Sequence, residues 1–170
     1  MPLDELAIDR HLQTPHDPAH ALLQNITRCL ISTTLNLLNS TGEQAFSSAL
    51  RSYHLPHGWP SFQDPVNHLS SFFFADCGRL MAIGPFLLNK VNEEHFKRQT
   101  LEVLKSKLEL HRISQVIAEI FECWVVMARA NALCFAEEIE DYAKIDETLI
   151  DLVKKLMHVS YILMCFLLIY

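Results

Sequence analysis

The sequence has little glycine and no paired cysteine motif. Among its 170 residues there are four glycines, so the glycine-rich loops that cradle phosphate groups are excluded. Gly-x-Ser-x-Gly is also missing, which excludes a nucleophile elbow. The five cysteines are far apart, form no Cys-x-x-Cys pair and stand among apolar residues, a pattern typical of reduced, buried thiols. We therefore expect an intracellular protein that is not an enzyme and has no catalytic residue of its own.

Histidine pairs occur, but they do not complete a metal site. His16 and His20 are four residues apart, with Pro18 between them at an expected helix start. His54 and His57 fall in an expected loop. Neither pair has a cysteine, a third histidine or a carboxylate at the spacing that a zinc shell requires. The sequence predicts no bound metal and no cofactor.

Charged residues are scarce and mostly acidic. They make up 20% of the chain against 50% hydrophobic residues, and the net charge is −6. A net acidic chain disfavours binding to nucleic acid, because phosphate contacts need a basic face. The apolar excess instead indicates a buried face for a protein partner or a contact with a membrane.

The apolar residues follow helical spacing, and no alternating run long enough for a strand appears. We predict an all-α fold, with a single helical domain of about five to seven helices over residues 1–155 and an apolar tail over 156–170. Helices are expected over 3–12, 19–38, 41–53, 65–84, 92–110, from 114 onward, and from 146, with a loop over 54–64. Trp59 and Phe62 are expected to attach that loop to the core.

The helix boundaries rest on capping signals. Thr41 has capping-box spacing to Gln44. Asp64-Pro65 repeats the signal of Asp17-Pro18, in which an N-cap precedes a proline at the first helical position. Asn92 and Ser114 are the expected caps of the two helices that follow. Gly84-Pro85 is expected to kink or break the helix that Pro65 opens.

Two arginines stand in strongly apolar surroundings. Arg79 lies within GRLMA and Arg129 within MARAN. Each either extends its charged group from a helix edge into water or forms a buried ion pair. The partners favoured by position are Asp76, Glu119 and Glu122.

The tail, LMHVSYILMCFLLIY, carries no formal charge when His158 is neutral and follows Lys154-Lys155. It is shorter than the roughly 17 to 25 residues that span a bilayer. Three alternatives remain open: a short membrane anchor, a buried core helix, or the end of a truncated reading frame. The protein is expected in the nucleus or cytoplasm, and at a membrane if the tail is an anchor.

Asp17-Pro18-Ala19-His20, with Asn25 on the same helix, resembles the Asp-x-x-His signature of DDE-type transposases of the CACTA-like or Plavaka-like kind. Gly58-Trp59, Ala75-Asp76 and Gly84-Pro85 resemble the helical region that follows that aspartate. The resemblance implies that Asp17 is a metal carboxylate in a larger transposase. No other carboxylate of the set is present, so it implies a non-catalytic fragment that acts through protein interaction.

The segment 78–83, GRLMAI, followed by Phe86, resembles the central-helix motif of Bcl-2-type apoptosis regulators, although Cys77 stands where that family has tryptophan. This resemblance implies a membrane-tethered regulatory protein with an apolar groove for a partner helix. The residues expected to bind the partner are Leu69, Phe72, Phe73, Arg79, Leu80 and Phe86.

Overall fold

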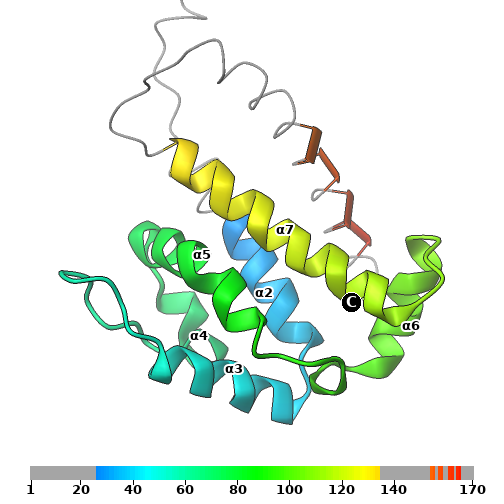
Figure 1. The fold of residues 1–170 in the computed structure, drawn as a ribbon, viewed down its shortest axis with the longest axis horizontal. Helices are drawn as coiled ribbons and strands as arrows, with labels where there is room; N and C mark the ends of the chain where they lie inside the picture. Colours follow the sequence, from blue (N-terminus) through cyan, green and yellow to red (C-terminus); the bar gives the residue numbers. More distant parts are fainter. Residues whose placement is uncertain (1–25, 135–153, 156, 159–160, 163, 166–170) are drawn as a thin grey trace, which may run out of the picture.

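The computed structural model describes residues 26–134 and eight residues of the tail, namely 154, 155, 157, 158, 161, 162, 164 and 165. This part of the chain is helical, and it confirms the predicted all-α single domain (Figure 1). Its elements are α2 (Arg28–Leu37), α3 (Ser40–Ser52), α4 (Pro65–His68), the 3₁₀ turn η3 (Leu69–Ser71), α5 (Phe74–Leu88), the 3₁₀ turn η4 (Glu93–His95), α6 (Arg98–Lys107) and α7 (Ile113–Cys134). The expected helices at 3–12 and from 146, as well as His16, Asp17 and His20, lie outside the described residues.

The core is organised around α5 and α7, which pack against each other in opposite directions (Figure 1). Near one end, the Asn131 amide donates to the carbonyl oxygen of Gly78 at 3.3 Å. Further along, Gly84 faces the ring of Trp124, which is fully buried. The indole N–H of Trp124 donates to Thr34 Oγ1 of α2 at 2.9 Å, so the same residue ties α2 to the pair.

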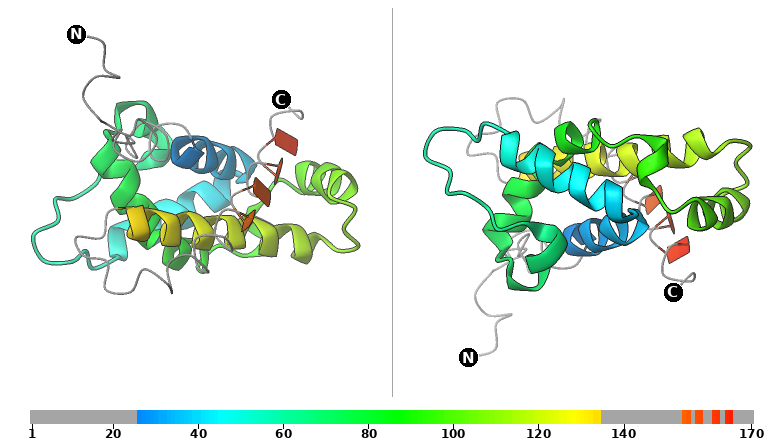
Figure 2. Two further views of the ribbon diagram at one scale, coloured as in Figure 1. Left: turned by 90° about the horizontal axis from the view of Figure 1, so that it is seen from above. Right: turned by 90° about the horizontal axis from the view of Figure 1, so that it is seen from below.

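Two segments far apart in sequence meet at the corner between α2 and α3. Leu38 and Phe96 form an isolated antiparallel bridge. The Asn39 N–H donates to the His95 carbonyl at 2.9 Å, and the Lys97 N–H donates to the Leu37 carbonyl at 2.8 Å. We call this contact the clasp; it joins the start of α3 to the start of α6, as seen from above and below in Figure 2.

The predicted helix 65–84 starts correctly but is not continuous. Asp64 Oδ1 accepts the Val66 N–H at 3.1 Å, which confirms the N-cap. The helix then passes through η3 and breaks at Phe72-Phe73, both in extended conformation. Asp76 Oδ2 accepts the Phe73 N–H at 3.0 Å and so caps a new helix, while Phe72 stacks on Phe62 with centroids 6.4 Å apart. Two strong local interactions therefore override the helical pattern.

Gly84-Pro85 was expected to kink or break the helix, and the structure shows that it does not break it. The helix α5 continues through Pro85 to Leu88. Proline removes one backbone donor, but the residues on both sides, Ile83, Gly84, Leu87 and Leu88, are buried. Packing against α7 therefore outweighs the lost hydrogen bond.

Three predicted caps are displaced. The N-cap of α3 is Asn39, not Thr41, because Asn39 Oδ1 accepts the Gly42 N–H at 2.9 Å. Asn92 opens only the turn η4, and α6 begins at Arg98. The loop over 54–64 is present as predicted, and its Trp59 and Phe62 pack against the core.

The third displaced cap is at α7. That helix begins at Ile113, so Ser114 lies inside it. Gln115 Oε1 instead accepts the N–H groups of His111 and Arg112, at 3.0 and 2.9 Å. Gln115, in the first turn of α7, thus binds back to the two residues that precede the helix, whereas Ser114 was expected to accept N–H groups within it.

Candidate partner-binding groove

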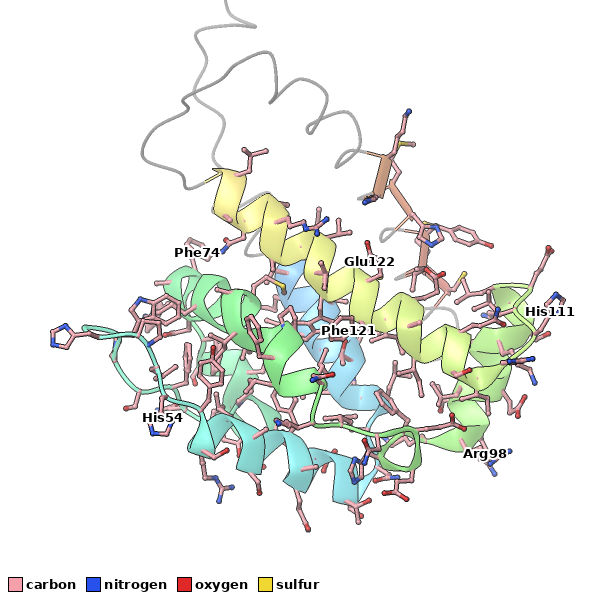
Figure 3. The ribbon with its side chains drawn as sticks, in the orientation of Figure 1. His54, Phe74, Arg98, His111, Phe121 and Glu122 are labelled. Carbon is pink, nitrogen blue, oxygen red and sulfur yellow. The ribbon has the colours of Figure 1, made fainter. Side chains whose placement is uncertain are left out.

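An apolar groove of about 590 Å³ runs between the exposed edges of α5 and α7. In Figure 3, Phe121 lies on the side of α7 that faces α5, and Glu122 lies farther from α5. The groove is lined from α5 by Ala82, Pro85, Phe86 and Asn89, and from α7 by Phe121, Val125, Ala128, Arg129 and Ala132. Apart from Asn89 and Arg129, the described residues that line this groove have apolar side chains.

The two ends of the groove differ, because α5 and α7 run in opposite directions. Phe86, near the end of α5, lies at the same end as Phe121, near the start of α7. Their side chains are 62% and 37% exposed, which is unusual for phenylalanine. Arg129 lies two helical turns further along α7, at the other end.

Small side chains separate these ends. Ala82, Ala128 and Ala132 line the middle and the basic end. They leave the floor low between the larger side chains, so the backbone of a guest segment can approach closely. The groove has an aromatic end, a shallow middle and a basic end.

The arginines behave differently from one another. Arg79 pairs with Asp76 at 3.0 Å, its charged group lies 5.7 Å from the Phe62 ring centre, and it remains 21% exposed. The ion pair with Asp76 was correctly anticipated, but it is not fully buried. Arg129 is exposed and has no ion pair within the described residues; Glu119, an expected partner, pairs with His158 at 2.9 Å.

Of the six residues predicted to bind a partner, the structure places only Phe86 in the groove. Leu80 is fully buried and Phe72 is 5% exposed, so both belong to the core and do not face outward. Leu69 is half-buried against that core. Phe73 is 78% exposed, but it lies with serines 61, 70 and 71 on another face.

Phe121 and Val125 were not among the predicted binding residues. The signal was present, because the apolar residues of α7 occupy more of the helix circumference than one buried stripe requires. A helix with apolar residues on two faces leaves one of them exposed when only the other packs against the core. The sequence pattern did not show which face this was.

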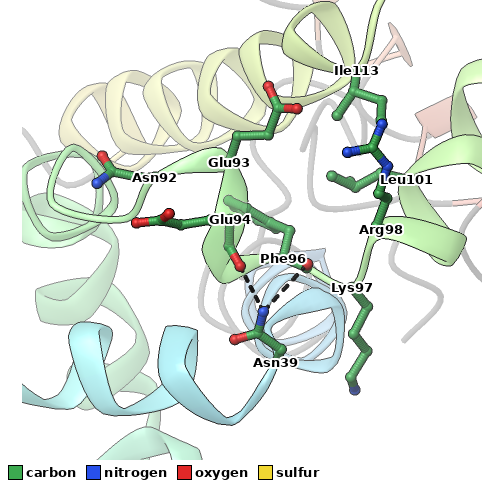
Figure 4. A pocket seen from close by; sticks show the side chains of 9 residues that line it. All are labelled: Asn39, Asn92, Glu93, Glu94, Phe96, Lys97, Arg98, Leu101 and Ile113. Atoms are coloured by element: carbon green, nitrogen blue, oxygen red, sulfur yellow. Dashed lines mark hydrogen bonds between the residues drawn. The ribbon is translucent and has the colours of Figure 1, made fainter.

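A second hollow, of about 790 Å³, lies beside the clasp (Figure 4). Glu93 and Glu94 border it on one side, and Lys97 and Arg98 on the other. The Asn39 amide in its wall already donates to the carbonyl oxygens of Glu94 and Phe96, at 2.7 and 3.4 Å. Its polar groups hold the fold together and carry mixed charge, so they do not converge on one ligand.

The thiols in the described core are poor nucleophiles. Burial, followed by the charges of Glu119 and Glu122, raises the pKa of Cys123 to about 12. Burial also raises the pKa of Cys77, although the Arg28 guanidinium opposes this. Protonated thiols do not attack, and in the described residues no three His, Cys, Asp or Glu side chains gather around a common metal position.

The described tail residues pack on the helical body. Ile162 and Cys165 are buried in the core, and His158 meets Glu119 of α7. Met157, Tyr161 and Met164 point outward and are more than half exposed. Within the described residues, no helix combines the length and the apolar content needed to cross a bilayer. This packing is that of the core-helix alternative; membrane anchoring stays a prediction.

Comparison of the chain with models of protein families, with curated proteins and with solved structures finds no match.

Proposed function

We propose that the chain is a non-catalytic helical interaction domain that binds an amphipathic helix of a partner protein in the groove between α5 and α7. The observation that carries this proposal is the exposure of two phenylalanines that line the same apolar groove, Phe86 from α5 and Phe121 from α7. Exposed aromatic side chains that cluster in a groove are the anchors of many protein interfaces.

The free energy gained by burying the exposed parts of the two phenylalanines is sufficient for recognition. A phenylalanine side chain buries at least ~150 Å² when fully covered, and apolar burial contributes ~25 cal/mol per Å². Covering the 62% of Phe86 and the 37% of Phe121 now in water thus yields about 2.3 and about 1.4 kcal/mol. The partner's own apolar side chains contribute a similar gain, which offsets part of the cost of association.

A helix fits the groove better than an extended strand or a small ligand. No sheet edge is present in the described residues to add a strand to. The walls offer one charged and one amide side chain, which is too few to orient a small polar ligand. Two helices with alanines between them instead form a trough that accepts a third.

The transposase resemblance remains a separate hypothesis, because Asp17 lies outside the described residues. The groove proposal does not depend on it. A fragment of a transposase that acts through protein contacts and an independent regulatory protein would both use such a surface.

Selection from a displayed library of 16-residue amphipathic helices tests the proposal. Peptides that bind the full chain are then measured against Phe86→Glu and Phe121→Glu, and against Val103→Glu as the matched control. Val103 is 44% exposed on α6, away from the groove. We expect at least about tenfold weaker binding for the two groove variants and no change for the control. Selected peptides that ignore both phenylalanines overturn the proposal.

A further inference from the structure

We infer that the partner helix carries a carboxylate at one end of its apolar stripe, about two helical turns from the residue that covers Phe86 and Phe121, and that this carboxylate pairs with Arg129. This inference rests on the function proposed above and deepens it by stating the chemistry and polarity of the partner.

The charges along the groove are arranged asymmetrically. Among the described residues that line it, Arg129 has the only charged side chain. Arg129 is exposed, and the described residues give it no ion pair, so its guanidinium is available. A helix that covers the groove also covers part of this arginine. An uncharged residue opposite it leaves a cation desolvated without a partner, whereas a carboxylate restores the lost interactions.

The opposite end has the reverse preference. Glu122 follows Phe121 directly, is exposed, and borders the aromatic end without lining the groove. Glu122 and Arg129 lie on the same side of α7, seven residues apart. This spacing is about 10 Å along the helix axis, which is too far for the two side chains to pair. An acid at the aromatic end of the partner would approach Glu122 and be repelled. The two rim charges therefore fix which end of the partner is acidic.

The spacing follows from helix geometry. Phe121 and Arg129 are eight residues apart on α7, about 12 Å along its axis. A guest helix that runs along the groove has the same rise, so its acidic residue lies about seven or eight positions from its apolar anchor. The alanines of the middle section favour apolar residues in the positions between them.

Three synthetic 16-residue helices that differ at two positions test the inference against the full chain. The parent comes from the displayed library and has Glu at the Arg129 end; the second has Gln there; the third has Gln there and Glu at the aromatic end. We expect the parent to bind about three- to tenfold more tightly than the second, and the third to bind most weakly.

Substitutions on the protein complete the test. Arg129→Gln should abolish the preference for the parent, and Arg129→Glu should reverse it in favour of a peptide with Lys at that position. Arg98→Gln on α6 is the matched control and should leave the preference unchanged.

The outcomes separate this inference from the function on which it rests. Binding that depends on Phe121 but not on Arg129 refutes the inference and keeps the groove. Binding that is indifferent to Phe121 refutes both. Self-association of the chain that Phe121→Glu abolishes in sedimentation also refutes the inference, because the occupant is then a second copy.

Discussion

Replacing Gly84 by alanine should raise the helix propensity of α5 but disturb its packing against α7. A Cβ built on Gly84 lies 2.1 Å from Cζ3 and 2.2 Å from Cε3 of Trp124. Ordinary contact between carbon atoms is ~3.5 to 4.0 Å, so the overlap is severe. The indole has no free direction in which to move, because it is fully buried and its N–H is bonded to Thr34.

The two opposing terms have different sizes. In an isolated helix, alanine is more favourable than glycine by about 1 kcal/mol. Inserting a methyl group into a close-packed contact costs about 3 kcal/mol at the upper end of the usual range, and the overlap places this site there. We therefore expect Gly84→Ala to lower the free energy of unfolding by about 2 kcal/mol and the melting temperature by about 4 to 8 °C.

Urea unfolding of the single variants and the double variant measures this coupling. Trp124→Leu removes the atoms that the new methyl group meets, although it is destabilising by itself. In that background, Gly84→Ala should no longer destabilise and should recover up to about 1 kcal/mol of helix propensity. If Gly84→Ala stabilises the unmodified chain by that amount, α5 and α7 are not in close contact at this point and the reasoning fails.

Three further predictions concern single groups. Asn39→Ala should lower the free energy of unfolding by about 1 to 2 kcal/mol, since it removes the N-cap of α3 and the bonds to Glu94 and Phe96; Asn39→Asp, which keeps the cap, should recover part of that loss in the same urea assay. Thr34→Val leaves the Trp124 N–H without its acceptor and should cost about 1 to 3 kcal/mol by thermal unfolding, whereas Ser32→Val, at a less buried position of α2, should cost little. Cys123 has a pKa raised from 9.0 to about 12, so the folded state keeps the proton that the unfolded state loses, and stability falls as the pH rises above 9.0. Cys123→Ala should therefore show a shallower fall in urea midpoint over that pH range. An equal slope in both proteins would contradict the assignment.

The existence of the helices could be predicted from sequence, because apolar spacing reports the face that a helix buries. The Asp64-Pro65 start and the loop at 54–64 also followed from local chemistry. The break at Phe72-Phe73 did not, since it depends on Phe62, ten residues away in the loop, and on the cap provided by Asp76. Continuation of α5 through Pro85 likewise depends on packing against another helix.

The groove was anticipated only through Phe86. Its other wall belongs to α7, and which residues of two helices share one surface depends on their relative rotation. That rotation is set by contacts such as Gly84 with Trp124, between residues 40 positions apart. Local pattern carries no information about such a pairing, so Leu80 and Phe72 were predicted to bind a partner although they lie in the core.

The clasp between Leu38 and Phe96 makes two distant parts of the chain open as one unit. Gly42 permits the close approach of the two segments, because a Cβ at this position would lie 2.1 Å from the His95 carbonyl oxygen. The start of α3 cannot fray without releasing the His95 and Leu37 carbonyls, and α6 then loses its attachment. The amides of Asn39 and Lys97 should accordingly exchange with deuterium at a common rate, although the two residues lie in distant parts of the sequence.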